Sequence, residues 1–208
     1  ENITTGSDNT AIGSGTMVDL TTGSNNTSCG KGSLALITTA SNNTAVGYDA
    51  MNANTTGASN TAVGYKALDA NTTGSSLTAV GTNALGSNTT ASFNSAFGLN
   101  ALATNTTGGV NDAFGYYALN ENTTGGANAA FGSRSLQSNT TASNNSAIGR
   151  DALRLNTTGT QNNALGAYAL DANTTGDYLT AIGTNALGTN TTGDLSLIHI
   201  SEPTRPED

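Results

Sequence analysis

The chain has 208 residues, of which 35% are hydrophobic and 10% are charged, and its net charge is −8 at pH 7. This acidic balance excludes the basic footprint of a nucleic-acid-binding protein. No apolar run approaches the roughly 20 residues of a membrane-spanning helix, so we expect no membrane insertion of this segment.

The sequence repeats every 17 residues. With Asn60 as position one, glycine stands at position five of eleven consecutive copies, from Gly13 to Gly183. Position nine is always Leu or Met, position four is always apolar, and position three is Ala with a single Ser, whereas positions six, seven and ten vary. A fixed period without insertions is typical of a solenoid in which each repeat forms one coil.

In the copy that spans residues 60–76, the first element is a short strand over 60–63 that ends at Gly64. Ala67 and Leu68 then return to the core, residues 71–73 form a second short strand, and Gly74 makes a second turn. This pattern predicts an all-β fold, a parallel β-solenoid or β-roll of about eleven coils. The alternative is an α/β solenoid with one short helical turn per coil, because residues 65–70 favour a helix.

Stacked coils place each side chain over its copy in the next coil, about 4.8 Å away. Thr, Asn, Val and Phe all tolerate such columns, and Asn amides can hydrogen-bond along them. The residues that we expect to define the coil are Gly47, Gly64, Gly81, Leu68, Leu85, Phe97, Phe114 and Phe131.

The apolar core of each coil is small, at about four residues, two of which are Ala. Apolar burial on this scale offsets only part of the entropy lost on ordering a coil. We therefore expect several chains to associate along the rod. Their register would be set by the Ala and Val positions of the first strand, and the three Phe residues of position four would form the thickest part of the interior.

The period stops after Asp194. We expect one solenoid domain over residues 1–194, truncated at both ends, followed by a non-native tail over 195–208. Residues 195–205 resemble a translated sequencing adaptor, and the alternative is a genuine C-terminal cap. This tail contains His199, the only histidine of the chain.

Few residues offer catalytic chemistry, so we expect neither an enzyme nor a cofactor or metal site. Cys29 stands at the apolar position four, which predicts a core residue. The carboxylates of Asp49, Asp151 and Asp171 stand at turns, where we expect them to be solvated.

Position twelve begins a repeated Asn-Thr-Thr triplet that has the pattern of an N-glycosylation acceptor. Selection for stacked Asn and Thr columns would produce the same triplets without any glycan. The nine asparagines concerned are Asn54, Asn71, Asn88, Asn105, Asn122, Asn139, Asn156, Asn173 and Asn190.

The segment Thr61-Ala-Val-Gly-Tyr-Lys-Ala67 resembles the head repeats of trimeric autotransporter adhesins. The complete 17-residue unit, which ends in Asn-Thr-Thr-Gly, is similar to repeat regions of bacterial and phage tail-fibre proteins. The resemblance covers residues 9–193 and implies a homotrimeric, left-handed parallel β-roll. It also implies an extracellular location, at a cell surface or on a virion, and a structural or adhesive role. The unit departs from the adhesin repeat by three extra residues around Asn-Thr-Thr.

Binding to a host-surface glycan or protein would use the variable positions, and our candidates there are Tyr48, Tyr65, Tyr116 and Tyr117. The alternative function is ice binding through regular ranks of threonine. Because neighbouring residues of a strand point to opposite sides, we expect only one of the two ranks, that of Thr72 or that of Thr73, to face outward.

Overall fold

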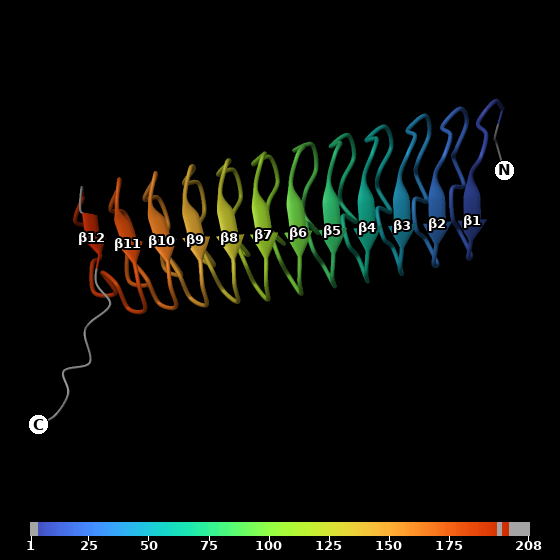
Figure 1. The fold of residues 1–208 in the computed structure, drawn as a ribbon. Coiled ribbons are helices and arrows are strands. Elements are labelled where there is room, and N and C mark those ends of the chain that lie inside the picture. Colours follow the sequence, from blue (N-terminus) through green and yellow to red (C-terminus); the bar gives the residue numbers. More distant parts are fainter. Residues whose placement is uncertain (1–3, 195–196, 200–208) are drawn as a thin grey trace, which may run out of the picture.

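The computed structural model describes residues 4–194 and 197–199, and for 197–199 it describes the backbone alone. Figure 1 shows one row of parallel strands, with turns on both sides of the row, that advances steadily along the chain. The described residues contain no helix. The all-β solenoid prediction is confirmed, and the alternative with a helical turn in each coil is wrong.

Within residues 4–194 and 197–199, twelve strands of three residues each form a single parallel sheet in chain order. Each strand residue pairs with the residue 17 places further on, as Thr61 does with Thr78. The strands are β1 (Thr10–Ile12), β2 (Thr27–Cys29), β3 (Thr44–Val46), β4 (Thr61–Val63), β5 (Thr78–Val80), β6 (Ser95–Phe97), β7 (Asp112–Phe114), β8 (Ala129–Phe131), β9 (Ser146–Ile148), β10 (Asn163–Leu165), β11 (Thr180–Ile182) and β12 (Leu197–His199).

Each strand ends at the glycine of position five, whose φ lies between 125° and 148° in all eleven copies. A side chain there would also collide with the next coil, since a Cβ on Gly64 would lie 2.5 Å from the carbonyl oxygen of Gly81. Three further residues of each coil, at positions seven, nine and seventeen, have positive φ; in the fourth coil they are Lys66, Leu68 and Ser76. Four left-handed residues per coil therefore turn the chain back on itself.

The predicted second strand, residues 71–73 in the fourth coil, is a bend rather than a strand. The amides of Thr72 and Thr73 both donate to the carbonyl of Thr89 in the next coil, at 2.9 and 3.3 Å. Two donors that share one acceptor do not alternate as strand residues do. The segment thus links neighbouring coils through its backbone without extended geometry.

The core of each coil consists of the inward residues of positions three, eight and nine, such as Ala62, Ala67 and Leu68, all fully buried. Position four points the other way, because neighbouring strand residues face opposite sides of a sheet. Cys29 is only half-buried and Phe131 is 39% exposed. The core prediction for Cys29 is therefore wrong, and in the single chain the Phe column lies on the outer face.

The three Phe rings do form the expected column. Phe97 and Phe114 stack with ring centroids 4.6 Å apart, and Phe114 and Phe131 stack at 4.8 Å. These separations match the spacing of adjacent strands in a sheet. The column therefore belongs to the outward face of β6–β8 rather than to the apolar core.

Two columns of asparagine side chains run through the interior. At position twelve, the Nδ2 of Asn71 donates to the Oδ1 of Asn54 at 2.8 Å and to the carbonyl of Gly74 at 3.0 Å. At position one, the Oδ1 of Asn43 accepts from the backbone amide of Asn60 at 3.0 Å. The prediction of hydrogen-bonded Asn columns is confirmed, and the columns satisfy polar groups that would be costly to bury alone.

The position-twelve column also settles the glycosylation pattern. Eight of the nine acceptor asparagines, from Asn54 to Asn173, are fully buried. Asn190 is half-buried, and its Nδ2 donates to the Oδ1 of Asn173 at 3.1 Å. A glycan on the Nδ2 atom of any of the eight buried asparagines is incompatible with the fold, so these triplets reflect the interior columns.

Strand β12 lies inside the segment that we interpret as a tail. Its backbone pairs with β11, with Leu197 opposite Thr180, and so continues the 17-residue register by one strand. The adaptor interpretation of 195–205 stays a prediction, and most of this segment lies outside the described residues.

Candidate functional site

The side chains at positions six, seven and ten form one long edge of the solenoid, which we call the variable edge. Neighbouring coils are joined there by backbone bonds, such as that from the amide of Lys66 to the carbonyl of Tyr48 at 2.9 Å. The amide of Arg134 bonds in the same way to the carbonyl of Tyr116, at 2.8 Å. Because the backbone carries these bonds, the side chains of the edge are free to differ from coil to coil.

The four predicted tyrosines all lie on the variable edge, as two separate pairs. Tyr48 and Tyr65 stack with ring centroids 5.4 Å apart, and both are exposed. Tyr116 and Tyr117 meet at 4.4 Å with their planes tilted by 54°. Two coils separate the pairs, so the structure does not bring the four residues into one site.

The most unusual part of the edge is a group that the sequence analysis missed, centred on Asp151. Its carboxylate is fully buried, which makes the prediction of a solvated side chain wrong. Arg134 donates to its Oδ2 at 2.7 Å, while the Nε of Arg150 lies 3.8 Å from Oδ2 and the Nε of Arg154 lies 3.8 Å from Oδ1. We call Arg134, Arg150 and Arg154 the arginine cluster.

The burial of Asp151 follows from the repeat. Arg134 stands 17 residues before Asp151 and therefore occupies the same position of the preceding coil, while Arg154 follows three residues later. The predicted solvation treated each carboxylate within its own coil and overlooked its neighbour along the column. By contrast, Asp49 and Asp171 are half-buried.

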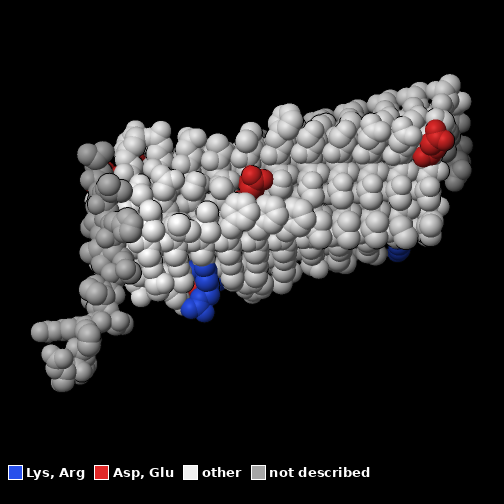
Figure 2. Space-filling model, in the orientation of Figure 1, with Lys and Arg blue, Asp and Glu red and all other residues white. Residues whose placement is uncertain are grey.

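The arginine cluster concentrates positive charge on an acidic protein. Residues 1–194 contain five Lys and Arg residues, and three of them surround this one carboxylate. Figure 2 shows blue side chains gathered beside the end of β9, well apart from a small blue patch near the early coils. The hydrogen bond to Asp151 raises the pKa of Arg134, whose guanidinium group is charged in any case.

Arg150 extends the cluster toward the next coil. Its guanidinium carbon lies 4.8 Å from the centroid of the Tyr168 ring, and one of its nitrogens donates to the Tyr168 hydroxyl. A cation over an aromatic face is stabilised by the quadrupole of the ring. This contact orients the most exposed of the three arginine side chains.

The outward face of the sheet is a second candidate surface. Its position-four residues are apolar, and several are well exposed, including Ile12, Ile148 and Leu165. Among the residues of strands β1–β11, only Asp112 carries a charge. Figure 2 shows that red and blue side chains are sparse on the face in view.

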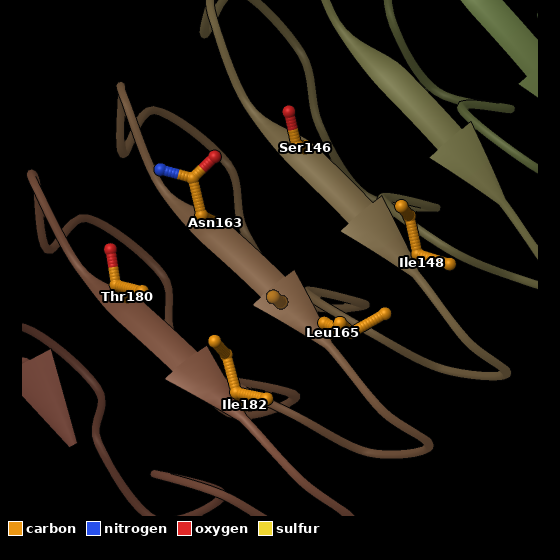
Figure 3. Close-up of a pocket in the computed structure, with 7 residues that line it drawn as sticks. Ser146, Ile148, Asn163, Leu165, Thr180 and Ile182 are labelled. Atoms are coloured by element: carbon orange, nitrogen blue, oxygen red, sulfur yellow. The ribbon is translucent and has the colours of Figure 1, made fainter. Parts of the chain in front are cut away.

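A shallow depression of about 230 Å³ lies on the same face over β9–β11. Figure 3 shows the polar side chains of Ser146, Asn163 and Thr180 in one column and the apolar side chains of Ile148, Leu165 and Ile182 in the column beside it. The lining residues are Ser146, Ile148, Asn163, Ala164, Leu165, Thr180 and Ile182.

The two threonine ranks differ from the prediction that only one faces outward. Thr73 of position fourteen is exposed, and Thr72 of position thirteen is half-buried rather than internal. The hydroxyl of Thr72 donates to the carbonyl of Thr89 in the next coil at 3.0 Å. Both ranks thus reach solvent, but in position thirteen the hydroxyl proton is already engaged.

Within the described part of the chain, no three His, Cys, Asp or Glu residues lie together in a way that could hold a metal ion. A search of the same part finds no helix long and apolar enough to cross a membrane.

Comparisons with known proteins leave the structure as the guide to function. No protein-family model matches the sequence, and no significant match was found among curated proteins or among solved structures.

Proposed function

We propose that this chain is a structural segment of an extracellular fibre, at a cell surface or on a virion, in which three copies associate in parallel through their outer sheet faces. The observation that carries the proposal is the apolar column of position four, which extends along strands β1–β11. Contiguous exposed apolar surface of this kind marks sites of protein association.

The burial pattern defines which residues such an assembly would use. Ala62 and its equivalents in β3–β11 are buried inside a single coil, so they cannot contact another chain. Val63, its neighbour on the strand, is 37% exposed and faces outward. The expectation that both the Ala and the Val positions set the register is therefore revised to position four alone.

The test is the association state of the full chain, measured by sedimentation equilibrium at micromolar concentration. We expect the parent to be a trimer, and the triple variant Phe114→Thr, Ile148→Thr, Leu165→Thr to lose the trimer. A matched control removes the same kind of exposed apolar surface elsewhere: Leu36→Thr, Leu99→Thr, Leu155→Thr. A monomeric parent, or equal effects of the two triple variants, would refute association through the sheet face.

A second candidate function is ice binding, favoured by the two solvent-facing threonine ranks at the regular spacing of the coils. The Thr72 hydroxyl already donates to the carbonyl of Thr89, which weakens this candidate. Only the exposed hydroxyls of the Thr73 rank can then donate hydrogen bonds to water. Thermal hysteresis and ice-crystal shape decide the question. A clear hysteresis that disappears when threonines of position fourteen are replaced would establish ice binding in place of the fibre role.

Adhesion by the variable edge is a further part of the fibre proposal. Tyr48 and Tyr65 present one exposed aromatic stack, and Tyr116 and Tyr117 present a second pair. Alanine variants of all four should weaken attachment to a host surface. Undiminished attachment by every one of them would show that the tyrosines are not the contact residues.

A further inference from the structure

We propose that the arginine cluster is a binding site for an acidic saccharide, whose carboxylate or sulfate ester would bind the guanidinium groups of Arg150 and Arg154. The inference concerns the variable edge, which lies apart from the outer sheet face. It therefore holds whether the chain is a monomer or a trimer.

The first argument is the balance of charge. Three guanidinium groups converge on the single carboxylate of Asp151, and the next carboxylate in these columns, Asp171, follows Arg154 by one coil and forms no ion pair with it within 4.0 Å, so positive charge is in excess at the cluster. Like charges held close together repel each other, and nothing in the fold of this coil requires three of them, because no other coil places more than one arginine or lysine at these positions. A bound anion would remove this repulsion.

The second argument is the number of free hydrogen-bond donors. A guanidinium has five N–H donors in a planar fork that matches the oxygens of a carboxylate or a sulfate. Arg134 uses one of them on Asp151, at 2.7 Å. Arg150 and Arg154 approach Asp151 only to 3.8 Å, too far for a hydrogen bond, so their forks are not used on that carboxylate.

The third argument is preorganisation. Asp151 is fully buried and anchors the cluster from below, while Tyr168 holds Arg150 through its ring and its hydroxyl. The arginine side chains nevertheless stay accessible, at 58% exposure for Arg150 and 35% for Arg154. Fixing a flexible side chain in advance lowers the entropy that binding costs.

The surroundings favour a saccharide over a free inorganic anion. Tyr168 follows Asp151 in the column of position seven, and Tyr117 precedes Arg134 in the same column. The cluster thus lies between two aromatic side chains that carry hydroxyl groups. Polar groups that converge beside aromatic surfaces are the usual composition of a small-molecule site.

The test uses the full chain and three fluorescent oligosaccharides of equal length: a neutral glucan, a polyuronate and a sulfated glucan. Fluorescence anisotropy at low salt should show binding of at least one acidic probe and none of the neutral one. The double variant Arg150→Gln, Arg154→Gln should lose about tenfold or more in affinity. It keeps the hydrogen bond between Arg134 and Asp151, so we expect its melting temperature to stay near that of the parent.

The matched control is Lys31→Gln, Lys66→Gln, which removes two positive charges from the same edge in other coils. We expect this control to bind as the parent does. Should the glutamine variant melt early, Arg150→Lys, Arg154→Lys keeps the charge but loses the fork, and it should bind more weakly than the parent.

Each outcome decides the proposal. Binding of the polyuronate alone identifies a carboxylate as the bound group, and binding of the sulfated glucan alone identifies a sulfate ester. Equal binding of the neutral probe, no binding of either acidic probe, or equal losses in the arginine variant and the lysine control would overturn it. Because the sedimentation experiment is separate, failure here would leave the fibre proposal standing.

Discussion

The replacement Asn105→Ala tests whether the interior Asn columns stabilise the solenoid. The Nδ2 of Asn105 donates to the Oδ1 of Asn88 at 3.1 Å and to the carbonyl of Gly108 at 2.9 Å. Its own Oδ1 accepts from the Nδ2 of Asn122 at 2.8 Å. All three asparagines are fully buried, so water cannot replace the bonds that the substitution removes.

The magnitude follows from which groups lose their partner. The carbonyl of Gly108 keeps a bond from Asn94, and the Nδ2 of Asn122 keeps its bond to Gly125, so the Oδ1 of Asn88 is the atom left without a donor. One unsatisfied buried acceptor costs about 1–3 kcal/mol. The small cavity adds about 1 kcal/mol. We expect the free energy of unfolding to fall by about 2–4 kcal/mol.

The isosteric replacement Asn105→Asp separates hydrogen bonding from packing. The new carboxyl would face two acceptors, the Oδ1 of Asn88 and the carbonyl of Gly108, and burial would raise its pKa in the folded state. A group with a raised folded pKa favours folding when it is protonated, and it loses that stability as the pH rises through the folded pKa. The stability that the Asp variant loses relative to the parent should therefore become smaller as the pH falls from about 7 to about 5. The stability lost by the Ala variant should stay the same over this range.

Urea unfolding followed by circular dichroism, at both pH values, measures these differences. The control is Asn52→Ala, which removes a half-buried amide whose Nδ2 donates to the carbonyl of Gly32 at 2.8 Å on the variable edge. The free energy of unfolding of this control should fall by less than about 1 kcal/mol, because water can replace the hydrogen bond of the lost amide. If Asn105→Ala were no more costly than Asn52→Ala, the columns would fill space without stabilising the fold.

Three other substitutions test separate parts of the coil by the same unfolding assay. Val110 is β-branched and has φ 61°, so Val110→Asn should raise the free energy of unfolding by about 1 kcal/mol. The reverse change at the equivalent position, Asn42→Val, should lower it by a similar amount. No gain in stability from Val110→Asn would argue against backbone strain at Val110. A Cβ on Gly64 would lie 2.5 Å from a carbonyl oxygen of the next coil, so Gly64→Ala should lower the free energy of unfolding by at least about 3 kcal/mol. The control is Gly109→Ala, where the nearest atom to the new Cβ lies at 3.2 Å, and it should lower the free energy of unfolding by less than about 1 kcal/mol. Burial raises the pKa of Asp69, so the parent loses stability as the pH rises through that pKa. Asp69→Asn should reduce this loss of stability between about pH 4 and pH 7. The same pH profile in the parent and in the Asn variant would contradict the prediction.

The course of the coil could be predicted because the repeat multiplies weak local preferences. A single Gly64 or Leu68 says little, but the same residue type at the same position of eleven copies implies one backbone conformation repeated eleven times. The Asn columns were predictable for the same reason, since stacking brings each amide over its copy.

The direction of position four was missed because an apolar residue was equated with a buried one. Strand alternation gives the answer: if Ala62 faces inward, Val63 must face outward. The small Ala fits the narrow interior, and the larger apolar side chains lie on the outside. A hydrophobic column on a strand can thus indicate a contact with another chain as well as a core.

Besides the glycine of position five, three positions of each coil have positive φ, and two of these could have been found from the sequence. Position seven holds Gly15 and Gly32 in early coils, and position seventeen holds Asn25 and Asn42, residues that adopt positive φ readily. Position nine offers no such indication, because the core requires Leu or Met there. At Leu68 the burial of the side chain overrides the preference of the backbone.

Backbone hydrogen bonding also determines where function can change without loss of the fold. In the interior, side chains bond to side chains of the next coil, so a substitution at Asn71 disturbs its neighbours in both directions. On the variable edge the coils are joined by backbone bonds, as between Arg134 and Tyr116, and those bonds do not depend on side-chain identity. A charged group such as the arginine cluster could therefore arise in one part of the edge while the period stayed intact. The positions that differ between repeats are, on this argument, those where a repetitive chain gains a local binding site, and those that stay constant maintain the rod.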